Sequence, residues 1–245
     1  MSELSPPPDV DPLKCVEPEP TDPRPGRAPV VVSIVLLVAT TGAAWWVWRQ
    51  LPADARVPMH WNAAGEIDGY GSRASLFLLP GTILLLTLLF AGLPYIEPRR
   101  GNLLRSSRAY GALWIAVVAF LALIHGASLA AALGRPAPMD KLATGGVGAV
   151  FLILGNYLGK VRSNYFFGVR TPWTLSSELS WNKTHRLAGR LFVVLGMATM
   201  IAALAGPSGL PLTIGWLISL GAATLIPVVY SYFVWRSDPH KAGAG

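Results

Sequence analysis

Four polar side chains between residues 60 and 68 form the first set that could do chemistry. They are His60, Asn62, Glu66 and Asp68. An imidazole and two carboxylates could ligate a divalent metal ion, or act as a general acid and base. Their spacing matches no metal-binding signature, however. The alternative is that Asn62 and Asp68 stabilise turns while His60 faces water, so we predict no bound metal and no cofactor here.

A second polar segment, NYFFGVRTPWTLSSELSWNKTHR, occupies residues 164–186. It places aromatic, basic and acidic side chains where a plain linker would suffice. Arg170 lies just before Thr171 and Pro172, where the backbone is biased toward extended or turn conformations. We expect Arg170 to pair with Glu178 across the following turn.

A helix is predicted after this turn. Thr174 or Ser176 would cap it, and Glu178 would lie in its first turn, where the helix dipole favours a negative charge. At helical spacing, Glu178, Trp181 and His185 share one face. Two interpretations stay open: a folded loop held by a charge pair and Trp anchors, and a docking surface for another protein.

One ionisable residue, His125, lies deep within an apolar run. Ionisable groups inside membranes are functional candidates by default. A buried neutral histidine with one hydrogen bond, to Ser128 or to another helix, is the alternative that we favour.

The elements that position these residues are membrane helices. The chain is 52% hydrophobic and only 13% charged, whereas soluble domains are about 25% charged. A helix of about 20 apolar residues crosses a hydrocarbon core, and no alternating barrel pattern is present. The sequence therefore predicts an all-α polytopic bundle with six spans: Val30–Trp48, Ser75–Ile96, Tyr110–Leu133, Leu142–Leu158, Leu187–Ala205 and Leu210–Trp235.

The distribution of basic residues predicts the orientation, because Lys and Arg in short loops favour the cytoplasmic side. With both termini inside, 15 of the 20 Lys and Arg residues are cytoplasmic. The remaining five, on the outer side, are Arg49, Arg56, Arg73, Arg135 and Lys141. The net charge of +7 then reflects topology and anionic lipid, and no nucleic acid partner is predicted.

The predicted organisation has four parts. Residues 1–29, with nine prolines and six acidic residues, form a disordered cytoplasmic tail that includes Cys15. Residues 30–109 form a two-helix unit with the outer loop 52–74, where Trp61 and Tyr70 would lie at the headgroups. Residues 110–236 form a four-helix unit, and 237–245 a second tail. Gly155 and Gly159 fit a close helix contact.

Several absences narrow the function. None of the 13 Asp and Glu residues lies in the middle of a span, which argues against a transporter driven by a buried carboxylate. The sequence has no HExxH, GxSxG or CxxC motif and no phosphate-binding glycine loop. No catalytic residue is assigned.

The stretch FGVRTPWTLSSELSWNKTHRLAGRLFVVLG resembles the signature of the SdpI family. The matching residues are Gly168, Arg170, Thr171, Pro172, Trp173, Thr174, Leu175, Glu178, Trp181 and Arg186, and the preceding Gly155, Asn156 and Asn164 also fit. The outer loop is similar to the small domain of unknown function that often precedes SdpI-like proteins, through Pro58, His60, Trp61, Asn62, Gly65, Asp68, Gly69 and Tyr70.

The resemblance implies a multi-pass protein of the bacterial cytoplasmic membrane. In this family the best-known member gives immunity to a secreted toxic peptide and holds a transcriptional repressor at the membrane. It thus implies an extracellular toxic peptide and a cytoplasmic repressor as partners, besides the lipid bilayer. The alternative is a membrane enzyme or transporter that uses His60 and His125.

Two surfaces are predicted from these arguments. An outer ligand site comprises His60, Trp61, Asn62, Glu66 and Asp68. An inner partner site comprises Asn164, Arg170, Thr171, Pro172, Trp173, Glu178 and Trp181.

Overall fold

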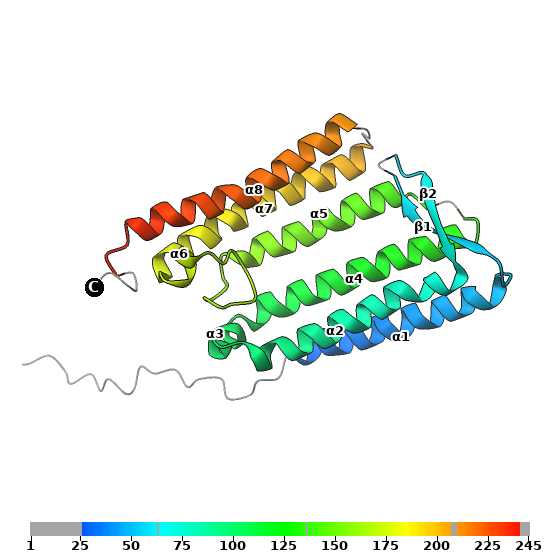
Figure 1. Ribbon diagram of the computed structural model, residues 1–245, viewed down its shortest axis with the longest axis horizontal. Helices are drawn as coiled ribbons and strands as arrows, with labels where there is room; N and C mark the ends of the chain where they lie inside the picture. Colours follow the sequence, from blue (N-terminus) through cyan, green and yellow to red (C-terminus); the bar gives the residue numbers. More distant parts are fainter. Residues whose placement is uncertain (1–25, 63, 136, 207–209, 241–245) are drawn as a thin grey trace, which may run out of the picture.

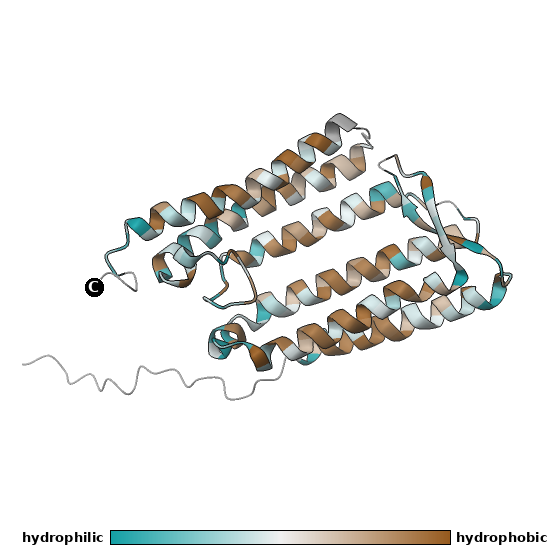
Figure 2. Cartoon of the chain, in the orientation of Figure 1, coloured by the Kyte–Doolittle hydropathy of each residue, from teal (hydrophilic) through white to brown (hydrophobic). Residues whose placement is uncertain are grey.

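Six long helices lie side by side in one bundle in the computed structural model (Figure 1), which describes residues 26–62, 64–135, 137–206 and 210–240. Each is long and apolar enough to cross a membrane. They are α1 (Arg27–Gln50), α2 (Leu78–Ile96), α4 (Ser107–Ala132), α5 (Met139–Leu158), α7 (Glu178–Ala205) and α8 (Leu210–Arg236). Hydrophobic residues cover the helices, and hydrophilic residues gather toward both ends of the bundle (Figure 2). The chain is therefore an all-α polytopic membrane bundle, as the sequence predicts.

The expected spans agree with these helices, with one large difference. α7 begins at Glu178, well before the predicted Leu187. Its first turns are polar and lie outside the predicted span, although the sequence does predict a helix with Glu178 in its first turn. Ser177 starts this helix because its side chain accepts a hydrogen bond from the Ser180 N–H. Most of the predicted tail, with Cys15, lies outside the described residues, as do residues 241–245.

Short elements close the two ends of the bundle. A two-stranded antiparallel hairpin of β1 (Arg56–Trp61) and β2 (Ile67–Ser72) joins α1 to α2, and β2 continues directly into the 3-10 helix η2 (Arg73–Phe77). At the other end, α3 (Arg100–Arg105) and α6 (Pro172–Leu175) flank the entries to α4 and α7 (Figure 1). The hairpin forms within the predicted outer loop 52–74, and α3 follows the predicted span Ser75–Ile96 in a segment for which no helix was predicted.

The hairpin is anchored on the bundle by apolar packing. Val57 is 1% exposed and belongs to a buried cluster with Ala44, Val47, Leu76 and Leu129 from three neighbouring elements. The β1–β2 register is irregular between Pro58 and Trp61, which indicates a bulge. The hairpin therefore has a fixed position over α1, η2 and α4.

The helices pack as two groups joined through α4. Helix α4 packs on α1 and α2, through a cluster that includes Trp114 and Val118, and also on α5. Helices α5, α7 and α8 form the second group. The predicted boundary at residue 109 remains a prediction, but α4 contacts both sides of it.

Glycines let α5 and α7 approach at backbone distance. A Cβ on Gly155 would lie 2.6 Å from the carbonyl oxygen of Gly189, and one on Gly196 would lie 2.8 Å from that of Gly148. Each helix therefore has two glycines seven residues apart that face the other helix. The expected close contact at Gly155 is confirmed. The second glycine of α5 that approaches α7 most closely is Gly148, where a Cβ would lie 2.7 Å from the nearest atom, and not Gly159, where the distance would be 3.3 Å.

A proline in α2 is compensated by a neighbouring helix. Pro94 has no N–H, so the carbonyl of Phe90 lacks its usual helical donor. The Tyr110 hydroxyl on α4 donates to that carbonyl at 2.5 Å. Backbone groups within lipid must be satisfied inside the protein, and this bond meets that requirement.

Candidate functional site

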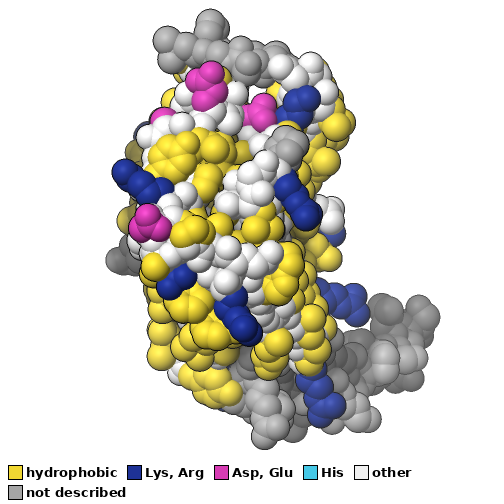
Figure 3. Space-filling model, turned by 90° about the vertical axis from the view of Figure 1, so that its right-hand side faces the viewer, with side chains coloured by type: hydrophobic (Ala, Val, Ile, Leu, Met, Phe, Trp, Pro, Cys, Tyr) yellow, Lys and Arg dark blue, Asp and Glu magenta, His cyan; other side chains and the backbone are white. Residues whose placement is uncertain are grey.

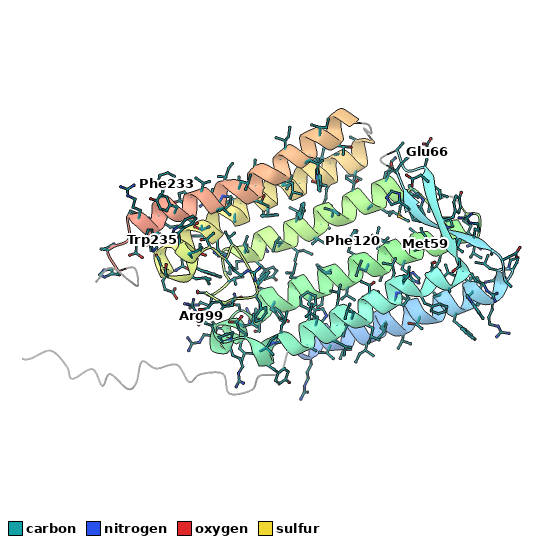
Figure 4. All side chains as sticks on the ribbon, viewed as in Figure 1. Met59, Glu66, Arg99, Phe120, Phe233 and Trp235 are labelled. Atoms are coloured by element: carbon teal, nitrogen blue, oxygen red, sulfur yellow. The ribbon has the colours of Figure 1, made fainter. Side chains whose placement is uncertain are left out.

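The two predicted surfaces lie at opposite ends of the bundle. The hairpin lies at one end, with Met59 and Glu66, and Arg99 lies at the other (Figure 4). The second end is formed by α3, α6 and the RTPWTL loop, which we define as residues 159–177.

At the hairpin end, the four predicted residues separate into two pairs. His60 Nδ1 lies 2.5 Å from Asp68 Oδ1, and these side chains are 73% and 46% exposed. Asn62 instead organises the turn: its Oδ1 accepts from the backbone N–H groups of Ala64 and Glu66, and its Nδ2 donates to Glu66 Oε2 at 2.9 Å. The expectation that Asn62 stabilises a turn is confirmed.

This end presents a mixed and exposed surface. Acidic and basic side chains lie among apolar ones across it (Figure 3). Trp61 is half-buried and Tyr70 is 50% exposed. Among the described residues, no group of three or more His, Cys, Asp and Glu side chains could hold a metal ion. His60 and Asp68 therefore form an exposed hydrogen-bonded pair that could bind a polar ligand.

At the other end, Asn164 folds the RTPWTL loop from within. It is fully buried. Its Oδ1 accepts from the N–H groups of Phe166 and Phe167, at 3.0 and 2.7 Å, and its Nδ2 donates to the carbonyls of Arg162 and Phe167. One amide side chain thus satisfies four backbone groups that the tight turn would leave without partners.

Trp181 and His185 hold the loop against α7. Trp181 Nε1 donates to the Val161 carbonyl at 2.7 Å, and its ring stacks on that of His185 with centroids 3.9 Å apart. His185 Nε2 accepts from the Val169 N–H at 3.0 Å, while Nδ1 lies 2.8 Å from the Trp181 carbonyl. An accepting Nε2 together with a donating Nδ1 assigns the neutral ring with its proton on Nδ1.

Gly168 is the point where the loop passes closest to His185. Its φ is +114°, which side chains rarely adopt, and a Cβ there would lie 2.2 Å from His185 Nε2. Glycine is required at this position both for the backbone conformation and for the space.

The motif itself builds a single helical turn. Thr171 and Thr174 form a reciprocal capping box at the start of α6, with Pro172 in the first turn, where its missing N–H costs nothing. Thr171 Oγ1 also lies 3.1 Å from Ser231 Oγ on α8. Thr171 is therefore the N-cap of α6 and Thr174 completes its capping box. The predicted cap of α7 by Thr174 or Ser176 is corrected to Ser177.

The expected pair of Arg170 and Glu178 is wrong. Arg170 donates to the Tyr165 carbonyl at 2.7 Å, and within the described part of the chain no ion pair joins it to Glu178. The capped turn of α6 lies between the two residues, so Arg170 turns back onto its own loop. Glu178 lies in the first turn of α7 and is exposed, as predicted.

His125 has a structural partner on another helix. The side chain is 2% exposed in α4, and its Nε2 lies 3.2 Å from the Thr40 carbonyl on α1. This confirms the buried, singly hydrogen-bonded histidine that the sequence favours. His60 and His125 have different partners, Asp68 and Thr40, so nothing in their contacts joins them in one site.

Comparison with known proteins finds a family model that matches each end of the bundle. Residues 160–231, which contain the RTPWTL loop, match the SdpI/YfhL protein family, and residues 35–84, which contain the hairpin, match DUF1648, a domain of unknown function. The chain is an SdpI-like protein. It is 23% identical over 206 residues to the Immunity protein SdpI of Bacillus subtilis strain 168, and the match covers 84% of this chain and 95% of that protein. No solved structure matches.

In this SdpI-like protein, burial divides the predicted inner residues into two sets. Asn164 and Trp181 are fully buried and Thr171 is 8% exposed, so these three cannot form a contact surface and instead fold the loop. Arg170, Pro172 and Glu178 are exposed, and Trp173 is half-buried with its ring 5.2 Å from that of Tyr232. Only this second set can meet a partner directly.

The RTPWTL loop also borders a groove of about 850 Å³. Its lining residues come from α3 and its N-cap, from the RTPWTL loop, from the start of α7 and from the segment after α8, and include Arg99, Asn102, Ser163, Leu175, Glu178, Asn182 and Asp238. The Ser177 hydroxyl donates to Asp238 Oδ2 at 2.5 Å, which joins the last described segment to the start of α7.

Sequence reasoning missed Glu97 and Arg99, which bind the RTPWTL loop from the end of α2. The sequence held one signal, because Glu97 directly follows an apolar span. In the structure this side chain is 4% exposed. A buried carboxylate at a helix end needs hydrogen-bond donors, and the basic count alone does not show where they come from.

Proposed function

We propose that this SdpI-like protein gives a bacterial cell immunity to a secreted toxic peptide, and that it signals through an inner regulatory protein. The observation that carries the proposal is the match over 95% of the Immunity protein SdpI. It spans both the hairpin and the RTPWTL loop, so the relative has counterparts of both candidate surfaces.

The hairpin is the proposed peptide site. Its exposed residues His60, Glu66 and Asp68 offer one imidazole and two carboxylates, and Tyr70 adds an exposed ring. A cationic or polar peptide would find hydrogen-bond acceptors here at the level of the lipid headgroups. With both termini in the cytoplasm, this surface faces the outside of the cytoplasmic membrane.

The proposed inner site is the exposed part of the RTPWTL loop. Arg170, Trp173 and Glu178 combine an aromatic ring with both charge signs, a composition typical of protein contact surfaces. The rigid support described above reduces the entropy that a partner would have to overcome on binding. An inner regulatory protein, such as a transcriptional repressor, is the proposed partner.

Transfer of immunity tests the proposal. The chain is expressed in a Bacillus subtilis strain that lacks its Immunity protein SdpI, and the cells are challenged with the toxin against which that protein gives immunity. We expect survival well above that of an empty vector. Survival equal to the empty vector, with the protein present in the membrane at normal abundance, would contradict the immunity function.

Alanine variants separate the two surfaces. H60A and D68A should reduce protection, because each removes one half of the exposed pair while leaving the Val57 anchor intact. R170A and W173A should leave protection unchanged and reduce capture of the inner partner in a pull-down from the same cells. K141A, a charge change on α5, is the control for abundance. Equal loss of protection in all four site variants would count against two separate surfaces.

A further inference from the structure

The buried carboxylate of Glu97, at the end of α2, binds the backbone of the RTPWTL loop. Glu97 accepts from the Tyr165 N–H with both oxygens, at 3.0 and 3.2 Å, and from the Arg99 N–H at 2.8 Å. The side chain is 4% exposed. Hydrogen bonds to an ionised acceptor are about twice as strong as neutral ones, so this contact fixes the loop firmly.

Three residues that follow Glu97 in the chain also hydrogen-bond to the RTPWTL loop: Arg99, Asn102 and Ser106. The Arg99 guanidinium donates to Ser163 Oγ and, at 3.0 Å, to the Leu175 carbonyl, and it lies 4.9 Å from the Tyr165 ring centre. Asn102 Nδ2 donates to the Ser163 carbonyl at 2.8 Å, and Ser106 Oγ accepts from the Arg162 N–H at 2.9 Å. We call Glu97, Arg99, Asn102 and Ser106 the latch.

At its other end, α2 is joined to the hairpin without a linker. Strand β2 ends at Ser72 and η2 begins at Arg73. The junction has no spare space: a Cβ on Gly71 would lie 2.5 Å from Ser75 Oγ and 2.9 Å from Met59 Cγ. A displaced hairpin must therefore displace the start of η2 and α2, because packed interiors transmit strain.

We propose that α2 couples the two ends of the protein, so that a change in the hairpin moves the latch and reshapes the groove at the RTPWTL loop. The latch residues Arg99 and Asn102 line that groove together with Ser163 and Leu175. Because the inner partner would meet this surface, the coupling makes its binding depend on the hairpin. The biological role of this coupling rests on the proposed function, whereas its test needs neither the toxin nor the inner partner.

The first measurement tests the latch by hydrogen exchange of the purified full-length protein in lipid nanodiscs. E97A should raise the exchange rate of the amides at 161–169 by about 10-fold or more, because the Tyr165 N–H loses its acceptor. E97Q, which keeps one carbonyl oxygen, should give a smaller rise. E178A is the matched control, since this carboxylate is exposed at the same end. Unchanged exchange in E97A would overturn the latch.

The second measurement tests the coupling. G71A perturbs the hairpin junction and should raise exchange at 161–169 by roughly 3-fold or more. G81A, inside α2 with nothing within 4 Å of the added Cβ, should not. G71A should have a smaller effect in the E97A background than on its own, since Glu97 carries part of the connection. If G71A does not fold, G69A serves instead, because its Cβ would lie 2.9 Å from His60 Cβ.

Two results would overturn the coupling. One is faster exchange in the hairpin of G71A with an unchanged RTPWTL loop. The other is an equal effect of G71A with and without Glu97. Neither measurement uses a toxin, so a failure of coupling and an absence of immunity are separate results.

Discussion

G168A is expected to disrupt the RTPWTL loop and lower the stability of the whole protein. An alanine must adopt a φ of +114° and place its Cβ 2.2 Å from His185 Nε2. The backbone conformation alone costs about 1–2 kcal/mol. Moving His185 aside also leaves the Val169 N–H without its acceptor, which costs about 1–3 kcal/mol more.

The thermal unfolding midpoint in detergent measures this effect. A loss of about 3 kcal/mol corresponds to a midpoint roughly 6–12 °C lower for a chain of this size. G134A is the matched control: its φ is +73°, and no atom lies within 4 Å of the added Cβ. G134A therefore has the energetic cost of a positive φ without a steric clash of the added Cβ. Equal shifts in G168A and G134A would show that the contact with His185 does not matter.

G189L is expected to separate α5 from α7 and to reduce the amount of folded protein in the membrane. Even a Cβ at residue 189 would lie 2.7 Å from the Gly155 carbonyl oxygen, and leucine adds three more carbons. Overpacking costs about 1–3 kcal/mol, and more where backbones touch. Membrane helices depend on such close packing because lipid supplies no hydrophobic drive between them.

Folded abundance is measured by size-exclusion chromatography of a fluorescent fusion, with G221L on α8 as control, since a Cβ there has nothing within 4 Å. We expect a large loss of the monodisperse peak for G189L and little change for G221L. A normal peak for G189L would mean that the close approach of α5 and α7 does not hold the bundle together.

Hydropathy alone predicts the membrane framework correctly because each span is a long uncharged run in a chain that is 13% charged. It fails at the boundaries where polar residues are helical. Residues 178–186 of α7 are polar, and they are helical because Ser177 caps them and Trp181 and His185 bury one face against the loop. Capping and tertiary burial override composition there.

The candidate site shows a similar division. The motif marks the correct segment and correctly places Glu178 in a first helical turn. Its internal contacts were not predictable, because the partners of Thr171 and Tyr165 come from Ser231 and Glu97, more than 55 positions away. Local spacing suggested an Arg170–Glu178 pair, but a backbone carbonyl at Tyr165 was the nearer acceptor.

The hairpin was also beyond local reasoning. The glycines and Asn62 indicate turns, but the strands form because Val57 reaches a cluster made by α1, η2 and α4. Isolated two-stranded hairpins are marginal in water, so this one depends on the bundle beneath it.

We propose that the hairpin and the RTPWTL loop face opposite sides of the cytoplasmic membrane, with the hairpin outside. Single-cysteine variants in a C15S background test it by labelling with a membrane-impermeant maleimide in intact spheroplasts. D68C should be labelled at once, and R162C, at an exposed loop position, only after the membrane is permeabilised. Labelling of R162C in intact spheroplasts, with D68C protected, would contradict this orientation.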